Sequence, residues 1–281
     1  MSSEGNPLAV VTGASSGIGL ELARLCARNN FDLVIAADEV TIEDAAQELS
    51  AEGISCTPVL CDLARQAGIE ELAQAVADDG RPVYALLANA GGGLGQAFLD
   101  QDIGAALDVA HTNIDGTLRL IHRIGREMRR RGEGRILITG SVAGLLPGTF
   151  QAVYHGSKAF LDSFAVALDN ELKDSGVTVT CLMPGPTETE FFERAGLTDT
   201  RPGTGPKADP AEVARVGFDA MMKGELKAIV GLRNRLRVAM SHVVPDTHLA
   251  EQQPKSTAPR TARAAKRKAG SRRKRGKAGR N

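Results

Sequence analysis

The sequence predicts a three-layer α/β fold, in which a parallel sheet lies between two layers of helices. Short apolar runs of four to seven residues alternate with amphipathic helical patterns along most of the 281 residues. Strands that are apolar on both faces are typical of a parallel sheet covered on both sides. No apolar run is long enough to span a bilayer, so we expect one sizeable soluble domain.

Seven segments are expected to form the strands of this sheet. They are 9–12, 32–37, 55–60, 83–88, 135–139, 178–183 and 227–230. Right-handed crossovers between them give a doubly wound Rossmann fold with a seven-stranded parallel sheet, whose ligand crevice lies at the carboxyl ends of the strands. One crevice could hold the residues that follow strand ends, which are Gly13, Asp38, Asn89, Ser141 and Pro184.

A glycine-rich turn, residues 12–19 with the sequence TGASSGIG, follows the first apolar run and precedes a helical pattern that ends near Arg28. Gly13, Gly17 and Gly19 allow a tight turn whose backbone can approach a pyrophosphate closely. The helix N-terminus adds free N–H donors and the positive end of its dipole. A strand-to-helix turn without a ligand is the alternative, and the place of the turn at the start of the alternating pattern argues against it.

Tyr154 and Lys158 are four residues apart, and Ser141 precedes Tyr154 by thirteen residues. Positions i and i+4 share one face of a helix, so the phenol and the ammonium can occupy the same site. A nearby cation lowers the pKa of a phenol from its usual value near ~10, which would let Tyr154 act as an acid or a base. For this motif taken alone, a solvated surface pair is the alternative.

Together these motifs resemble the short-chain dehydrogenase/reductase family, and the similarity covers roughly residues 7–190. The glycine turn fits the family's Thr-Gly-x-x-x-Gly-x-Gly motif, and Tyr154 with Lys158 fits its Tyr-x-x-x-Lys motif. Further signatures follow in the family's order, at Asp62, Asn89-Ala90-Gly91, Asn113 and Pro184-Gly185-Pro186-Thr187. The resemblance implies a nicotinamide-dependent oxidoreductase that acts on an alcohol or a ketone.

The resemblance also implies roles for four catalytic residues, Asn113, Ser141, Tyr154 and Lys158. Tyr154 would exchange a proton with the substrate oxygen, Ser141 would hydrogen-bond that oxygen, and Lys158 would lower the Tyr154 pKa and hold the nicotinamide ribose. Asn113 would hold a water that links Lys158 to solvent, and a helix-interior Asn that bonds a nearby carbonyl is the alternative. The implied cofactor contacts are Gly13, Ser15, Ser16, Gly17, Ile18, Gly19, Asp38, Asp62, Leu63, Asn89, Ala90, Gly91, Tyr154, Lys158, Pro184, Gly185 and Thr187.

Asp38 favours NAD over NADP as the cofactor. It follows the second expected strand about 25 residues after Gly13, where a carboxylate can accept hydrogen bonds from the ribose 2′-hydroxyl and would repel a 2′-phosphate. No Arg or Lys lies within the glycine turn. Asp38 could instead cap the following helix, and Glu39 could take either role.

The remaining composition bears on redox state, location and assembly. The four cysteines lack Cys-x-x-Cys spacing and the five histidines lack metal-ligand spacing, so we expect reduced thiols and no metal. The polar first residues show no signal-peptide pattern, and we expect a cytoplasmic protein. Family analogy suggests a homodimer or a homotetramer built on the long helices around Asn113 and Tyr154.

Beyond Thr187 the resemblance weakens, and residues 188–208 are expected to form a lid over the substrate. Phe191 and Phe192 could contact an apolar substrate or pack a short helix onto the domain. Over 232–240, apolar residues recur every four positions between arginines, which predicts a basic amphipathic helix. This helix could dock on the domain or on a second subunit, or lie on a membrane surface.

The formal net charge of zero hides a basic C-terminal segment. Residues 254–281 hold twelve of the 34 Lys and Arg residues and no Asp or Glu, so the rest of the chain holds 22 basic and 34 acidic residues, a net of −12. We therefore expect residues 1–250 to form one Rossmann-fold domain and 251–281 to be a disordered Lys/Arg-rich tail.

Such a tail could bind DNA, RNA or another polyanion without base specificity, or lie on the protein's own acidic surface. A nucleotide-sensing binding protein that acts on nucleic acid through the tail is therefore the alternative to an oxidoreductase. The enzyme is favoured, because a sensor has no need to keep Ser141, Tyr154, Lys158 and Asn113 together.

Overall fold

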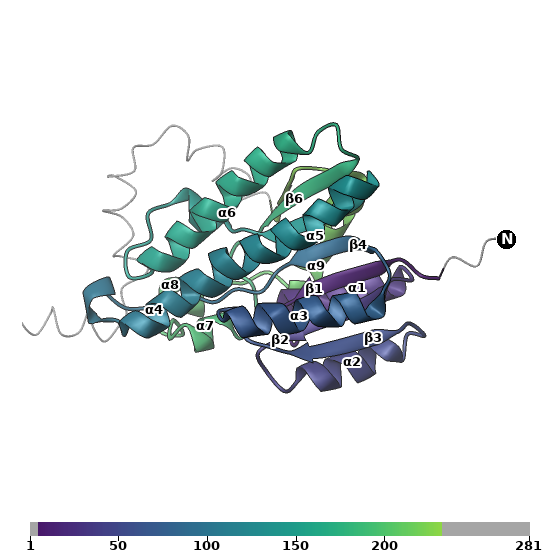
Figure 1. Ribbon diagram of the computed structural model, residues 1–281. Coiled ribbons are helices and arrows are strands. Elements are labelled where there is room, and N and C mark those ends of the chain that lie inside the picture. The colour runs from purple at the N-terminus through teal and green to yellow at the C-terminus, as the bar shows by residue number, and fades with distance from the viewer. Residues whose placement is uncertain (1–4, 232–281) are drawn as a thin grey trace, which may run out of the picture.

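In the computed structural model, which describes residues 5–231, seven parallel strands form one sheet between two layers of helices (Figure 1). The strand order is β3-β2-β1-β4-β5-β6-β7, and it reverses between β1 and β4, as in a doubly wound fold. The strands are β1 (Leu8–Thr12), β2 (Asp32–Ala37), β3 (Cys56–Leu60), β4 (Val83–Ala88), β5 (Gly134–Thr139), β6 (Val177–Met183) and β7 (Lys227–Ile229). The predicted fold class is confirmed, and each strand end lies within one residue of its expected place.

Three helices pack on each face of the sheet. One layer holds α1 (Gly17–Arg28), α2 (Ile42–Ser50) and α9 (Pro210–Lys223). The other holds α3 (Gln66–Asp79), α5 (Thr117–Arg131) and α6 (Ala152–Glu171), which lie across the near face of the sheet in Figure 1. Shorter elements follow the strands at one edge: η1 (Phe98–Asp100), α4 (Ile103–Ala110), η2 (His111–Gly116), η3 (Val142–Leu145), α7 (Phe191–Arg194) and α8 (Arg201–Thr204).

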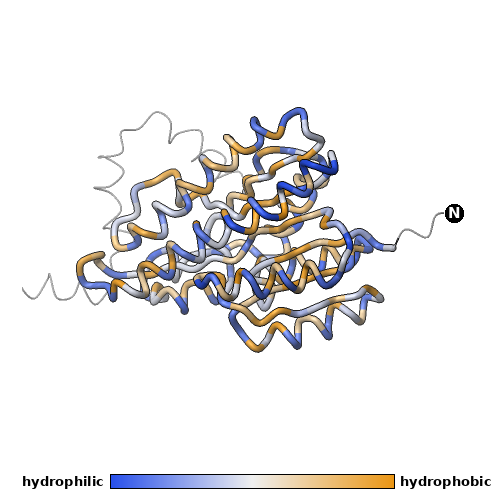
Figure 2. Tube along the Cα trace, viewed as in Figure 1, coloured by the Kyte–Doolittle hydropathy of each residue, from blue (hydrophilic) through white to orange (hydrophobic). Residues whose placement is uncertain are grey.

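Alternate side chains of the central strands fill two separate hydrophobic cores. In β1, Val11 faces α1 and α9, whereas Val10 faces the layer of α3, α5 and α6. The strands are consequently apolar on both faces, and Figure 2 shows them as continuous hydrophobic segments between helices of mixed character. Full burial of each large aliphatic side chain contributes roughly 1.5–3 kcal/mol to folding. This double coverage explains why the strands are short apolar runs in the sequence.

Local signals fix the ends of α9, the last helix before β7. The Asp209 side chain accepts a hydrogen bond from the Ala211 N–H (3.0 Å), and Pro210 occupies the first turn, where a missing N–H costs nothing. Gly224 ends the helix in the left-handed conformation, at φ 70°. Within residues 5–231, no helix combines the length and the apolarity needed to cross a membrane.

The predicted tail (251–281) and the predicted basic amphipathic helix (232–240) lie outside the described residues. The predicted lid, residues 188–208, lies within them and contains two short helices, α7 and α8. The Thr200 side chain caps α8 by accepting a hydrogen bond from the Gly203 N–H (3.2 Å). The glycine- and proline-rich part of this segment therefore holds local helical structure.

Candidate active site

A cavity of about 1440 Å³ lies at the carboxyl ends of the strands. It brings together every site residue expected from the sequence except Asn113. The expected residues that line it are Gly13, Ser15, Ser16, Gly17, Ile18, Gly19, Asp38, Asp62, Leu63, Asn89, Ala90, Gly91, Ser141, Tyr154, Lys158, Pro184, Gly185 and Thr187. One crevice thus brings together residues that are up to 174 positions apart in the sequence, from Gly13 to Thr187.

The glycine turn forms the entrance to α1 and leaves its first amides available. Gly13 (φ 65°) and Gly17 (φ 56°) have left-handed backbones, and a Cβ at Gly13 would lie 2.9 Å from the Ala90 Cα. Ser16, at the N-cap position, makes no capping hydrogen bond, and the first turn of α1 holds no acidic residue. An uncapped helix N-terminus beside a closely packed glycine turn fits the pyrophosphate of a dinucleotide.

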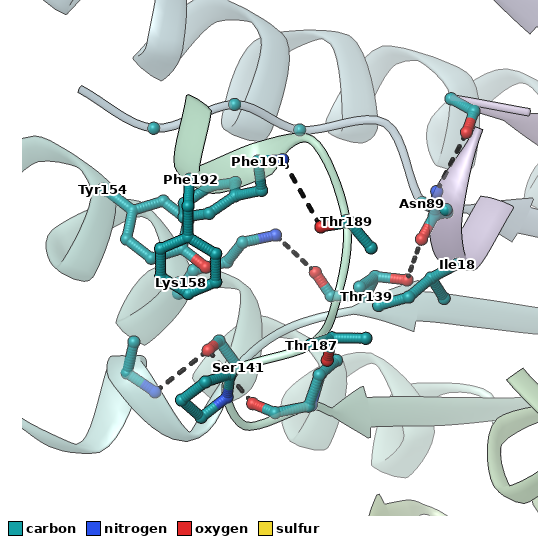
Figure 3. Close-up of a pocket in the computed structure, with 18 of the residues that line it drawn as sticks. Ile18, Asn89, Thr139, Ser141, Tyr154, Lys158, Thr187, Thr189, Phe191 and Phe192 are labelled. Atoms are coloured by element: carbon teal, nitrogen blue, oxygen red, sulfur yellow. Dashed lines mark hydrogen bonds between the residues drawn. The ribbon is translucent and has the colours of Figure 1, made fainter. Parts of the chain in front are cut away.

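Asn89 ties three strands together beside this turn (Figure 3). Its side-chain amide donates to the Thr12 carbonyl oxygen (3.1 Å), and its Oδ1 accepts a hydrogen bond from the Thr139 hydroxyl (3.0 Å). The Thr12 hydroxyl oxygen in turn accepts hydrogen bonds from the N–H groups of Asn89 and Ala90, each at 3.0 Å. The ends of β1, β4 and β5 are held in register at the cavity wall.

Asp38 lies at the end of β2, exposed toward the cavity. The helix that follows begins at Ile42 with Thr41 in the N-cap position, so Asp38 is not the cap of α2. Glu39 is engaged elsewhere, because its carboxylate accepts a hydrogen bond from the Ser15 hydroxyl (3.1 Å). The Asp38 carboxylate therefore remains available at the position where an acid in a Rossmann fold contacts the adenosine ribose.

The Tyr154 and Lys158 side chains extend from α6 into the cavity opposite the glycine turn (Figure 3). The Lys158 ammonium is buried, donates to the Thr139 carbonyl oxygen (2.7 Å) and lies 6.0 Å from the centre of the Tyr154 ring. Tyr154 hydrogen-bonds Ser141, whose hydroxyl donates to the Pro184 carbonyl oxygen (3.3 Å) and accepts from the Ala143 N–H (3.0 Å). The phenol and the serine are thus hydrogen-bonded to each other, and the Thr139 carbonyl oxygen holds the lysine ammonium near the phenol ring.

The expectation that Lys158 lowers the Tyr154 pKa does not hold in this structure. Burial raises the pKa of Tyr154 to about 12; the hydrogen bond with Ser141 opposes the rise, and the negative charge of Asp162 adds to it. Burial also lowers the pKa of Lys158 to about 8, against the favourable effect of the Asp162 carboxylate. Removal from water disfavours the charged form of both groups, so each shifts toward its neutral state.

Asn113 lies behind the cavity and contacts it through the backbone of Gly92. Its Oδ1 accepts from the Gly92 N–H (2.9 Å), and its amide donates to the Gly92 carbonyl oxygen (3.0 Å) and to the Ser157 hydroxyl (2.8 Å). The residue is completely buried in η2, a π-helical turn between α4 and α5. These contacts match the alternative in which Asn113 bonds nearby backbone, and π-helical turns are frequent at functional sites.

Phe191 and Phe192 both line the cavity and both pack in the segment around α7. Phe192 is buried against Ala195 and Leu197, and the partly buried Phe191 packs against the same small core. The Phe191 ring lies 4.9 Å from the Tyr154 ring. Packing of Phe192 therefore fixes α7 in a position that places Phe191 beside Tyr154.

Two features of the site were missed by the sequence analysis. The Arg194 guanidinium bonds Glu39 (2.7 Å) and Glu190, which connects α7 to the loop after β2. An ion pair between residues 155 positions apart leaves no signal in one sequence. Asp162 lies four residues beyond Lys158 on the same face of α6, and the helical spacing that paired Tyr154 with Lys158 could have identified it.

The four cysteines are free thiols, and only Cys56 is less than fully buried. Burial raises the pKa of Cys26 to about 12, so the thiolate form is disfavoured. Among residues 5–231, no group of three or more His, Cys, Asp or Glu side chains is arranged to hold a metal ion.

The family model described as short chain dehydrogenase matches residues 7–199. A Streptomyces coelicolor protein named "Putative ketoacyl reductase" is 34% identical over 194 residues, which cover 67% of this chain and 74% of that protein. A short-chain dehydrogenase from Sphingobium yanoikuyae in complex with NADPH superposes with a TM-score of 0.75 at 28% identity, over 85% of this chain and 96% of that one. A short-chain dehydrogenase/reductase from Burkholderia phymatum in complex with NAD superposes with a TM-score of 0.77 at 24% identity, over 86% and 95%.

The fold and the position of the cavity place the chain in the doubly wound Rossmann class. The extent of the family match makes the assignment specific, and the chain belongs to the short-chain dehydrogenase/reductase family.

Proposed function

We propose that the protein is an NAD-dependent dehydrogenase or reductase that interconverts an alcohol and a ketone, with Tyr154 as the general acid and base. The observation that carries the proposal is the hydrogen-bonded pair of Tyr154 and Ser141, with buried Lys158 near the phenol ring, in the cavity that begins at the uncapped glycine turn. The ketoacyl reductase name of the Streptomyces coelicolor relative supports a carbonyl substrate for that class of site.

A bound nicotinamide supplies or accepts the hydride. Tyr154 gives a proton to the substrate oxygen during reduction and takes it back during oxidation. The Ser141 hydroxyl stabilises the developing alkoxide by turning its hydrogen from the Pro184 carbonyl, where the bond is long at 3.3 Å, toward the substrate oxygen. Lys158 would hold the nicotinamide ribose and keeps a cation in reach of the phenol, while Asn113 holds the Gly92 backbone.

The residues that would hold the cofactor run from the glycine turn to Thr187. The amides of the turn and of α1 would bind the pyrophosphate, and Asp38 would accept hydrogen bonds from the ribose hydroxyls. Asp62 and Leu63 would border the adenine. One solved relative is complexed with NADPH and another with NAD, so the preference for NAD rests on Asp38. A fluorescence titration should give NADH the lower Kd, and tighter binding of NADPH would overturn the preference.

Replacement of the two tyrosines separately tests the chemistry. The chain contains only Tyr84 and Tyr154. Tyr154→Phe should lower kcat by about 10²–10⁴-fold, the usual contribution of a general acid, while NADH still binds. Tyr84→Phe is the matched control and should keep full activity. A panel of secondary alcohols, hydroxysteroids, 3-hydroxyacyl compounds, sugars and β-hydroxy amino acids supplies the substrates. Undiminished turnover by Tyr154→Phe on any of them would refute the assignment.

We also propose that the protein assembles as a homodimer or homotetramer through the helices around Asn113 and Tyr154. Exposed apolar side chains support this, because Ile103 and Leu107 on α4 and Phe160 on α6 face solvent in the single chain. Light scattering of the full chain should give at least twice the mass of one chain. A monomer at micromolar concentration would exclude such an assembly.

The basic segment, residues 254–281, is proposed to bind polyanions, which is also what the nucleotide-sensing alternative requires. Duplex DNA should bind the full chain more weakly as salt rises, and a chain that ends at Gln253 should lose that binding. Equal binding by the two chains would exclude the segment as the binding site for DNA.

A cytoplasmic location is a separate proposal, and cell fractionation tests it.

A further inference from the structure

Asp162 is a buried carboxylate that the proposed chemistry does not use, although it lies directly beneath the catalytic group. Tyr154, Lys158 and Asp162 are spaced by four residues along α6 and share one face of the helix. The Asp162 Oδ1 accepts a hydrogen bond from the Ser141 N–H (3.2 Å) and another from the Cys181 thiol (3.5 Å). One side chain therefore contacts the backbone of the expected catalytic serine from the helix that carries the expected tyrosine and lysine.

The loop that carries Ser141 is shaped around this carboxylate. Gly140 and Gly144 flank Ser141, and a Cβ at either position would collide with an oxygen of Asp162. Both glycines are thus close-approach positions whose missing side chains make room for the acid. The β5–η3 loop and the Asp162 side chain fit together as one unit.

The Asp162 Oδ2 is buried and has no hydrogen-bond partner among the described residues. Burial raises the pKa of Asp162 to about 6, and the groups that oppose this rise are the Ser141 N–H, the Cys181 thiol and the cations Lys158 and Lys227. The carboxylate in turn raises the pKa values of Lys158, Tyr154 and Cys181. A buried carboxylate with one unpaired oxygen is costly in its charged form, and the positive charges of Lys158 and Lys227 offset part of this cost.

We propose that Asp162 is a positioning residue of the active site, which fixes Ser141 through its backbone N–H and sustains the ammonium form of Lys158 by its negative charge. The inference rests on the proposed function, in which Ser141 and Lys158 act on substrate and cofactor. Its effect is nevertheless measurable in the protein alone, without substrate. A failure of this inference is therefore distinguishable from a failure of the proposed chemistry.

The first experiment titrates Lys158 in the full chain by NMR of ¹³C-labelled lysine side chains, with its signal assigned by its loss in Lys158→Met. Asp162→Asn keeps an acceptor oxygen for the Ser141 N–H and removes the charge. The Lys158 midpoint should fall by at least about one pH unit, the size expected when the opposite charge of a neighbouring buried side chain is lost. Asp169→Asn is the matched control, because Asp169 also lies on α6 and accepts a backbone N–H (Val179, 3.4 Å), and it should leave the midpoint unchanged.

A midpoint shift of less than about 0.3 unit in folded Asp162→Asn would overturn the electrostatic half of the proposal. If that variant does not fold, the reciprocal measurement decides. Coupling between two titrating groups is symmetric, so Lys158→Met should raise the Asp162 carboxyl midpoint by a similar amount. An unchanged Asp162 midpoint would overturn the proposal equally.

Hydrogen exchange tests the contact with Ser141. Asp162→Ala removes the acceptor and should speed exchange of the Ser141 amide by at least about tenfold, whereas Asp162→Asn should retain most of its protection. Thermal unfolding of each variant, together with exchange at a remote strand such as β2, corrects for a global loss of stability. If the Ser141 amide exchanges equally slowly in Asp162→Ala and in the unchanged protein, the proposal that Asp162 fixes Ser141 is overturned.

Discussion

Thr12 offers a stability test whose size follows from two hydrogen bonds. Thr12 is 1% exposed, and its hydroxyl oxygen accepts hydrogen bonds from the N–H groups of Asn89 and Ala90 at 3.0 Å each. Thr12→Val keeps the shape and the strand preference of the side chain and removes this acceptor. The Asn89 N–H keeps a second acceptor, the Leu87 carbonyl oxygen (3.0 Å), whereas the Ala90 N–H loses its partner. Because an unsatisfied buried donor costs about 1–3 kcal/mol, we expect a loss of stability within that range.

The matched control is Thr180→Val in β6. Thr180 is fully buried, and its hydroxyl makes one hydrogen bond, to the Glu225 carbonyl oxygen (2.8 Å). Loss of one such bond costs about 0.5–1.5 kcal/mol. Urea unfolding with an unchanged m-value should therefore show a larger loss of stability for Thr12→Val than for Thr180→Val.

A functional readout accompanies the stability measurement, since the released segment, residues 89–91, borders the proposed cofactor site. NADH affinity should fall in Thr12→Val and stay unchanged in Thr180→Val. Thr12→Ser, which keeps the acceptor, should recover most of both losses. The reasoning fails if Thr12→Val is as stable as Thr180→Val, because the Ala90 N–H would then have found another partner.

Three further outcomes follow from charged and buried groups. Arg81 lowers the pKa values of Asp32 and Asp79 below the ordinary value of 3.8, so the stability it contributes is present above about pH 4 and is lost as pH falls through the lowered values. Unfolding curves of Arg81→Met and the unchanged chain should accordingly differ at pH 7 and converge in acid. Arg194→Gln removes exposed ion pairs worth less than about 1 kcal/mol, and stopped-flow measurements should show faster NADH release with little change in Tm. Cys26 should react with iodoacetamide only after unfolding, as mass spectrometry of the peptides would show.

The sheet and the lining of the cavity were predictable because their causes are local in sequence. Val10 and Val11 belong to an apolar run that only a doubly covered strand explains, and Gly13 and Gly17 mark backbone conformations that other residues rarely adopt. Once the order of strands is known, the residues after them converge without further information. Helical spacing likewise placed Tyr154 and Lys158 on one face.

Contacts made across the fold were not predictable in this way. Arg194 meets Glu39 only because α7 folds back over the loop after β2, and Asn113 bonds Gly92 because a π-helical turn rotates it toward that backbone. Phe191 and Phe192 are adjacent in sequence, and only the fold shows that Phe192 is buried in the lid while Phe191 lies against the Tyr154 ring. In each case the deciding partner is distant in sequence, and no spacing rule connects the two.

The ionisation states show why proximity alone is an incomplete guide to a catalytic pair. Spacing correctly placed a cation near the phenol, but the direction of the Tyr154 pKa depends on how much water both groups lose. At a pKa of about 12 the phenol stays protonated near neutrality. Removal of the hydroxyl from water and the negative charge of Asp162 both favour the neutral phenol, whereas the hydrogen bond with Ser141 favours the phenolate. The protonation state of Tyr154 therefore depends on burial, Ser141 and Asp162, which the spacing between Tyr154 and Lys158 does not reveal.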